Sequence, residues 1–101
     1  LCEKADADPN KVIKALKGGW ADSKILQTHG KRMIDKDFSP KGKTSTHSKD
    51  MNNIIECARN YNTELPISNL VKEMYKTLVK NGHGDKDHSS LYKEIKRINN
   101  E

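Results

Sequence analysis

Residues 66–82 read PISNLVKEMYKTLVKNG, and this stretch decides the fold class. Its large apolar side chains recur every three or four residues, which is the spacing of one face of an α-helix. They are Leu70, Val71, Met74, Tyr75, Leu78 and Val79. We therefore predict an amphipathic helix over 70–79, with Ser68 as a plain cap, Pro66 and Ile67 as a possible extension of its start, and Gly82 as its stop.

Two more stretches, 51–58 and 91–98, show the same spacing. Their apolar stripes are Met51, Ile54, Ile55 and Ala58, and Leu91, Tyr92, Ile95 and Ile98. We expect these stripes and that of 70–79 to form one core. No segment alternates with period two over a strand's length. The sequence therefore predicts an all-α fold of about five helices, organised as a single helical domain over residues 1–101.

Two shorter helices are predicted near the N-terminus. Asp8-Pro9 is a helix-start signal, because the Asp side chain can cap free amides and Pro at the first helical position loses no hydrogen bond. Gly18-Gly19 stops this helix. A second helix is expected from about 22 to 35, and its interior Gly30 indicates close packing against a neighbour.

The longest irregular stretch is DFSPKGKTSTHS, residues 37–48. We predict a loop here and a third helix that begins at about Ser48. This places Lys49 and Asp50 at a helix start, where the helix dipole favours a carboxylate and opposes an ammonium. Asp50 therefore has a structural explanation, and Lys49 is the better candidate for a functional role.

Composition argues against several classes of protein. The net charge of +5 comes from 16 Lys and 3 Arg spread along the chain among 14 acidic residues, which is typical of a solvated surface more than of a nucleic-acid interface. A non-enzymatic basic helical module that binds nucleic acid or a protein partner stays open as the alternative. No segment has the roughly 20 apolar residues of a membrane span. Cys2 and Cys57 have no CxxC spacing, so we expect a soluble cytoplasmic protein with reduced thiols.

The segment GHGDKDHSS, residues 82–90, offers possible metal ligands within a short distance. They are His83, Asp85, Asp87 and His88. Their spacing fits neither an EF-hand loop nor a helical HxxxH pair. Asp87 or Ser89 as the cap of the last helix explains the motif more simply, so we predict no metal site.

Taken in order, several motifs resemble the C-terminal domain of the 3-hydroxyisobutyrate dehydrogenase family. They are DPNKVIKALKGG (8–19), WADSKIL (20–26), MIDKDFSP (33–40), HSKDMN (47–52), ELPISNLVKEMY (64–75) and NGHGDKDHSSL (81–91). The nearest branch is that of the tartronate semialdehyde reductases. The resemblance extends from Leu1 to about Ile98, and the opening LCEKADAD reads like the tail of a helix already under way, so we expect a fragment of a longer chain.

The resemblance implies an oxidoreductase that transfers a hydride between NAD, or possibly NADP, and a small hydroxyacid such as glycerate. A Rossmann domain would be the N-terminal partner, with a catalytic Lys on the interdomain helix, so no catalytic residue is expected within residues 1–101. The helical domain would close over the cofactor and form homo-oligomers. The resemblance also implies that Lys49 lies near the cofactor and that Asp50 faces the cleft that holds cofactor and substrate.

Two further residues are candidates for the substrate pocket. Trp20 follows a pair of glycines, and it is a hinge anchor, a core residue or a pocket wall; the resemblance brings its turn, with Ser23, near the substrate cleft. His47 lies beside the Lys49-Asp50 pair and is the histidine of most interest, whereas His29 is expected to be a buried structural residue. Many family members have an aromatic residue where this chain has Gly42, so an aromatic wall of the pocket is missing or supplied elsewhere.

Overall fold

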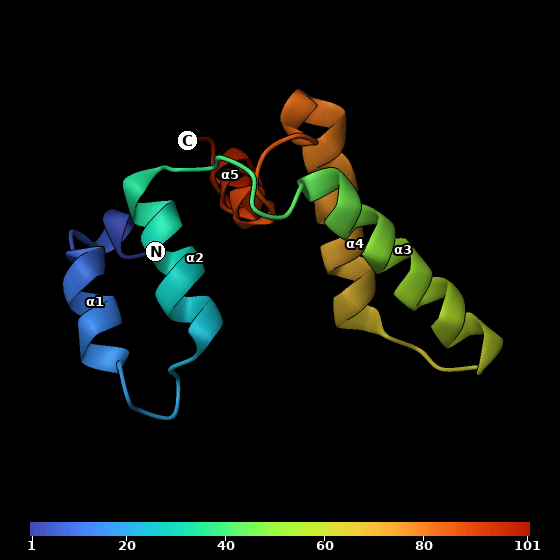
Figure 1. Ribbon diagram of the computed structural model, residues 1–101, viewed down its shortest axis with the longest axis horizontal. Helices are drawn as coiled ribbons and strands as arrows, with labels where there is room; N and C mark the ends of the chain where they lie inside the picture. The colour runs from blue at the N-terminus through green and yellow to red at the C-terminus, as the bar shows by residue number, and fades with distance from the viewer. The chain divides into compact units, whose positions relative to one another are not determined.

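A computed structural model describes residues 1–101 and contains five α-helices, three short helical segments and no strand (Figure 1). The predicted all-α class and the number of helices are therefore confirmed. The chain divides into two compact units, residues 1–37 and 38–101. None of its helices has the length and apolar character needed to cross a membrane.

The first unit contains the short segment η1 (Glu3–Ala5) and the helices α1 (Pro9–Leu16) and α2 (Lys24–Asp35). Local side chains define both helix starts. The Asp8 carboxylate accepts a hydrogen bond from the Asn10 amide at 2.9 Å, and the Ser23 hydroxyl accepts one from the Leu26 amide at the same distance. The predicted start of α1 is confirmed, and α2 begins two residues later than predicted.

Gly30 allows α1 and α2 to approach closely. A Cβ atom at this position would lie 2.6 Å from Cδ1 of Ile13 on α1, a distance at which Ile13 would have to move. The predicted close packing around Gly30 is thus confirmed, and α2 is continuous through it.

The second unit is built on an antiparallel pair of helices, α3 (Thr44–Asn60) and α4 (Pro66–Leu78), as Figure 1 shows. It continues through η2 (Val79–His83) and η3 (His88–Ser90) into α5 (Leu91–Ile98). The buried apolar residues lie along the seam between α3 and α4, namely Met51, Ile55, Ala58, Tyr75 and Leu78. Val71 and Leu91 pack against them.

This core is narrower than the predicted one. Four residues of the predicted stripes are about half exposed or more, namely Ile54 (46%), Leu70 (63%), Ile95 (47%) and Ile98 (54%). The physical reason is that a helix pair buries only the residues that point into its seam, and an apolar stripe wider than this seam stays partly in solvent.

The predicted start of the third helix is wrong, because α3 begins at Thr44 and not at about Ser48, so the preceding loop is shorter than predicted. The possible extension of the next helix through Pro66 and Ile67 is confirmed. Ser68 is therefore not its cap but lies inside α4, which begins at Pro66 with Leu65 at its cap position and no side-chain cap. Proline at the first helical position has no amide hydrogen to satisfy, which explains a start without a polar cap.

Candidate functional site

Lys49 and Asp50 lie in the second turn of α3, and both are exposed. The prediction that this pair opens the helix is wrong, because four residues of regular helix precede the predicted start at Ser48. The helix dipole acts mainly on the first turn, so it neither opposes Lys49 nor explains Asp50. Neither side chain forms an ion pair or hydrogen bond, which leaves both free to meet a ligand.

The helical repeat separates Lys49 from the core of its own unit. Met51 and Ile55 point into the seam with α4, and successive residues turn by about 100° around a helix axis. Lys49 therefore points away from α4, on the outer face of α3. A side chain in this position is available to a group outside the second unit.

His47 lies on the inner side of α3, unlike Lys49. Its ring centroid is 4.8 Å from that of Tyr75 and 4.9 Å from that of His88. The Tyr75 hydroxyl donates a hydrogen bond to the backbone carbonyl of His88 at 3.1 Å, and burial together with the Asp87 charge raises the pKa of Tyr75 to about 12. The structure thus separates His47 from the Lys49-Asp50 pair, and its role at a substrate pocket stays a prediction.

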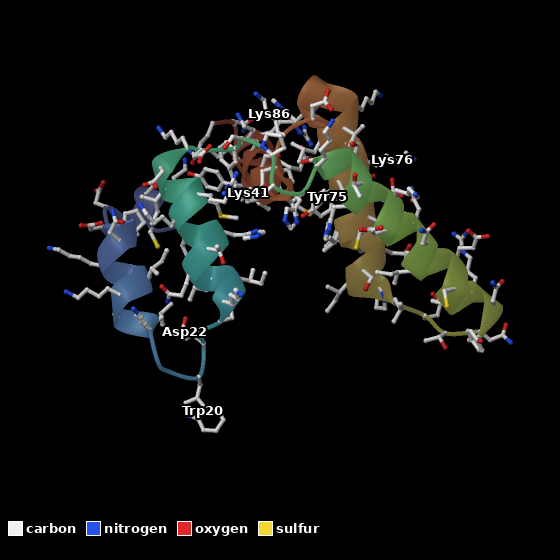
Figure 2. The ribbon with its side chains drawn as sticks, in the orientation of Figure 1. Trp20, Asp22, Lys41, Tyr75, Lys76 and Lys86 are labelled. Atoms are coloured by element: carbon white, nitrogen blue, oxygen red, sulfur yellow. The ribbon has the colours of Figure 1, made fainter.

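Trp20 lies in the first unit, on the turn between α1 and α2, and its side chain is fully exposed (Figure 2). The alternative that Trp20 packs in the core is therefore wrong.

Sequence reasoning missed Asp22, whose carboxylate stabilises the turn between α1 and α2. It accepts hydrogen bonds at 2.8 Å from the Gly18 amide, the Ser23 amide and the Gln27 side chain. The bonds from Gly18 and Gln27 are the main causes that lower the pKa of Asp22.

Asp87 is the most strongly bonded side chain of the second unit and is 1% exposed. One carboxylate oxygen accepts the amides of Lys41 (3.0 Å) and Gly42 (3.2 Å), and the other accepts the amide and hydroxyl of Ser89. Burial acts to raise the pKa of Asp87, but these hydrogen bonds outweigh it and hold the pKa well below its ordinary value. Asp87 caps η3, the short segment that leads into the last helix, whereas α5 itself has Ser90 at its cap position and no side-chain cap, so the prediction that Asp87 or Ser89 caps the last helix is wrong.

The loop of residues 84–86, which precedes Asp87, accepts hydrogen bonds from the first amides of α3, a helix that has no side-chain cap of its own. The Thr44 amide donates to the Lys86 carbonyl at 2.8 Å, and the Ser45 amide donates to the Gly84 carbonyl at 3.0 Å. Thr44 itself is fully buried, and its hydroxyl also bonds the Lys86 carbonyl. The first two amides that a free helix start would offer to an anion are therefore already occupied by carbonyls of residues 84–86.

Gly42, where the chain departs from the family pattern, lies against the ring of His88. A Cβ atom at Gly42 would be 3.3 Å from Cδ2 of His88, and the Gly42 carbonyl accepts the His88 amide at 2.8 Å. An aromatic side chain at position 42 would require His88 to move. The imidazole ring of His88 thus lies beside Gly42, at the position that a side chain of residue 42 would otherwise occupy.

Comparisons with known proteins place these features in a family context. The family described as NAD-binding of NADP-dependent 3-hydroxyisobutyrate dehydrogenase matches residues 1–95. The 2-hydroxy-3-oxopropionate reductase of Escherichia coli (strain K12) is 39% identical over 100 residues, which are 99% of this chain and 34% of that protein. The probable 3-hydroxyisobutyrate dehydrogenase-like 1, mitochondrial, of Arabidopsis thaliana is 29% identical over 96% of this chain and 29% of its own length.

The fold is also found in a solved structure. The crystal structure of a 3-hydroxyisobutyrate dehydrogenase from Salmonella typhimurium matches 91% of this chain and 32% of that chain, with a TM-score of 0.85 and 17% identity. The chain therefore spans about a third of the length of the relatives that it matches.

Proposed function

The chain belongs to the 3-hydroxyisobutyrate dehydrogenase family of NAD(P)-dependent hydroxyacid dehydrogenases, and from this membership we propose that it is the C-terminal helical domain of such an enzyme. The match of the family over residues 1–95 carries this proposal. The proposed reaction is hydride transfer between NAD and a small hydroxyacid, with glycerate and tartronate semialdehyde as the pair favoured by the 39% identity to a 2-hydroxy-3-oxopropionate reductase.

The exposed ammonium of Lys49 is the group in this chain that best fits a cofactor or substrate oxygen. It is free of ion pairs and points away from the α3–α4 seam. Once the cleft closes and water is excluded, a charge-assisted hydrogen bond from Lys49 orients that oxygen and stabilises negative charge on it. The nicotinamide cofactor, when bound, supplies the hydride chemistry. Asp50 is proposed to line the same cleft on the substrate side.

The phosphate and adenosine contacts are assigned to another part of the enzyme. No GxGxxG loop occurs in residues 1–101, and the first two backbone amides of α3 are occupied by carbonyls of Lys86 and Gly84. A Rossmann domain N-terminal to this chain supplies these contacts in our proposal, and a Lys on the helix between the two domains acts as the general acid or base.

The isolated chain is therefore expected to bind NAD weakly and to turn over no hydroxyacid. Calorimetry with residues 1–101 should give no sub-micromolar affinity for NAD or NADP, whereas the enzyme that contains both domains should bind one of them and reduce tartronate semialdehyde. Comparing its rates with NADH and NADPH identifies the cofactor. Sub-micromolar binding by the isolated chain would show that the cofactor site has been misplaced.

Self-association is the second part of the proposal, and exposed apolar side chains along the α3–α4 hairpin support it. Ile54, Tyr61, Ile67 and Leu70 are 46%, 77%, 78% and 63% exposed. Exposed apolar side chains on a small domain favour contact with a partner, and a second copy presents the same apolar residues.

We expect residues 1–101 to sediment as dimers or larger assemblies at high micromolar concentration. Leu70→Glu should shift the chain toward monomer, because it places a charge among the exposed apolar residues. Lys76→Glu, on the same helix and also exposed, is the control and should leave the assembly in place. A clean monomer at high micromolar concentration before any substitution would contradict this part of the proposal.

A further inference from the structure

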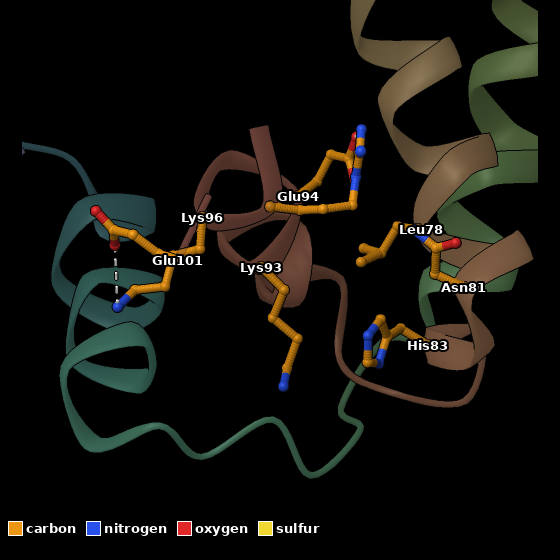
Figure 3. A pocket seen from close by; sticks show the side chains of 8 residues that line it. Leu78, Asn81, His83, Lys93, Glu94, Lys96 and Glu101 are labelled. Atoms are coloured by element: carbon orange, nitrogen blue, oxygen red, sulfur yellow. Dashed lines mark hydrogen bonds and ion pairs between the residues drawn. The ribbon is translucent and has the colours of Figure 1, made fainter. Parts of the chain in front are cut away.

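The second unit contains a surface pocket of about 340 Å³ that the proposed reaction does not use. It lies between α5 and the η2 segment, and the side chain of Leu78, only 1% exposed, forms part of its wall (Figure 3). Pockets of roughly 300 Å³ and more are large enough for small organic ligands.

The charges around this pocket do not balance. Its lining includes three cationic side chains and two carboxylates. Both oxygens of Glu94 are bonded to Arg97, at 2.8 and 2.7 Å, and Glu101 lies 3.5 Å from the Lys96 ammonium. Both carboxylates are thus already paired, and the charge of Lys93 is left without an acidic partner.

Lys93 is positioned by an aromatic ring. Its ammonium lies over the ring of Phe38, 5.2 Å from the centroid, a contact that holds a cation without neutralising it. His83 and Asn81 reach the pocket from η2, and neither side chain forms a hydrogen bond or ion pair. Figure 3 shows Lys93 and His83 extending into the pocket region from their separate elements. An ammonium, an imidazole and an amide thus belong to one pocket lining that also includes an apolar wall.

We infer that this pocket binds a small oxyanion, either an organic carboxylate or a phosphate. The ammonium of Lys93 provides the charge, and the N–H groups of His83 and Asn81 provide directional hydrogen bonds to the remaining oxygens. The carbon atoms of an organic carboxylate would contact Leu78. The pocket shares no residue with the proposed cofactor cleft, so its binding is tested without reference to the proposed dehydrogenase activity.

The test is an NMR titration of residues 1–101 at pH 7, with sodium acetate and sodium phosphate in separate experiments and sodium chloride at matched ionic strength. Saturable shifts of the Asn81 side-chain amide and the His83 ring are expected, with a dissociation constant on the order of 1 mM. Lys93→Gln should weaken binding about tenfold, the lower limit for loss of a charge-assisted hydrogen bond. The anion that binds more tightly identifies the ligand class.

Lys80→Gln is the matched control, because Lys80 is an exposed lysine next to Asn81 that does not line the pocket. The dissociation constant of each anion for the Lys80→Gln variant should stay within about twofold of its value for the unsubstituted chain. Three results would overturn the inference: no saturable shift with either anion, the same shifts with chloride, or equal weakening by the two substitutions. A failure of the enzyme to use NAD would leave this result unaffected.

Discussion

Lys49→Ala is expected to lower kcat/KM of the enzyme that carries this domain by about 10- to 150-fold. The substitution removes a charge-assisted hydrogen bond in a closed cleft, and such a bond contributes roughly 1.5–3 kcal/mol. Stability should not fall, because Lys49 is exposed, forms no hydrogen bond or ion pair that would be lost, and alanine is the better helix former. Steady-state kinetics together with thermal unfolding separate the two effects.

Alanine substitutions at two other basic residues, Lys43 and Arg59, serve as controls for Lys49→Ala. Lys43 precedes α3 and pairs with the exposed Asp85 at 2.9 Å, and Arg59 lies on the same helix in its last turn. Exposed pairs of this kind contribute at most about 1 kcal/mol to stability. Each alanine variant should stay within about twofold of the unsubstituted enzyme in kcat/KM. Equal and negligible losses from all three substitutions would identify Lys49 as ordinary surface charge.

Asp87→Ala is expected to destabilise the chain by about 3–5 kcal/mol, which is a large part of the roughly 5–15 kcal/mol that stabilises a typical domain. The substitution leaves the amides of Lys41, Gly42 and Ser89 without their acceptor in a buried position. It also loosens the loop whose carbonyls cap α3. Urea unfolding measures the loss, and Asp87→Asn, which keeps one acceptor oxygen, should lose less.

The neighbouring Asp85→Asn is the control for Asp87. Asp85 is 90% exposed in its ion pair with Lys43, so its removal should cost less than about 1 kcal/mol. An equal loss of stability for the two substitutions would show that the buried hydrogen bonds of Asp87 contribute no more than a surface charge.

Asp87 also predicts a pH dependence of stability. Its pKa is lower in the folded chain than the value of 3.8 for an unperturbed carboxyl, so the folded state favours the charged form. The resulting stabilisation is fully present above pH 3.8 and is lost as the pH falls toward the folded pKa. The difference in unfolding free energy between the unsubstituted chain and Asp87→Asn should therefore shrink below pH 3.8 and stay constant between pH 5 and 7. A constant difference down to pH 2 would contradict this assignment.

The sequence by itself determined the features that depend on neighbouring residues. The helix start at Asp8 is formed by a hydrogen bond that spans only two residues, and the spacing of apolar residues over 70–79 lies within one helical stretch. Such interactions are complete within a few residues of chain, so local patterns reveal them. For the same reason, the motif of residues 82–90 marks Asp87 as a candidate cap, and Asp87 caps η3 through the Ser89 amide.

Only the tertiary structure decided where α3 begins and which residues share a face with Lys49. The first amides of α3 are satisfied by carbonyls of Gly84 and Lys86, about 40 residues further along the chain, so no local cap marks the start. With that start misplaced, Lys49 was assigned to a helix end, although it lies on the outer face of the second turn. Sequence proximity groups His47 with Lys49, but His47 packs inward against Tyr75.

The exposure of Ile54 and Leu70 was likewise decided by the packing of whole helices. An apolar residue is buried only if another element covers it, and a sequence pattern specifies the apolar face without specifying its neighbours. Long-range hydrogen bonds and the number of packed elements are properties of the folded chain. They determine which of the predicted residues remain free to meet a ligand or a partner.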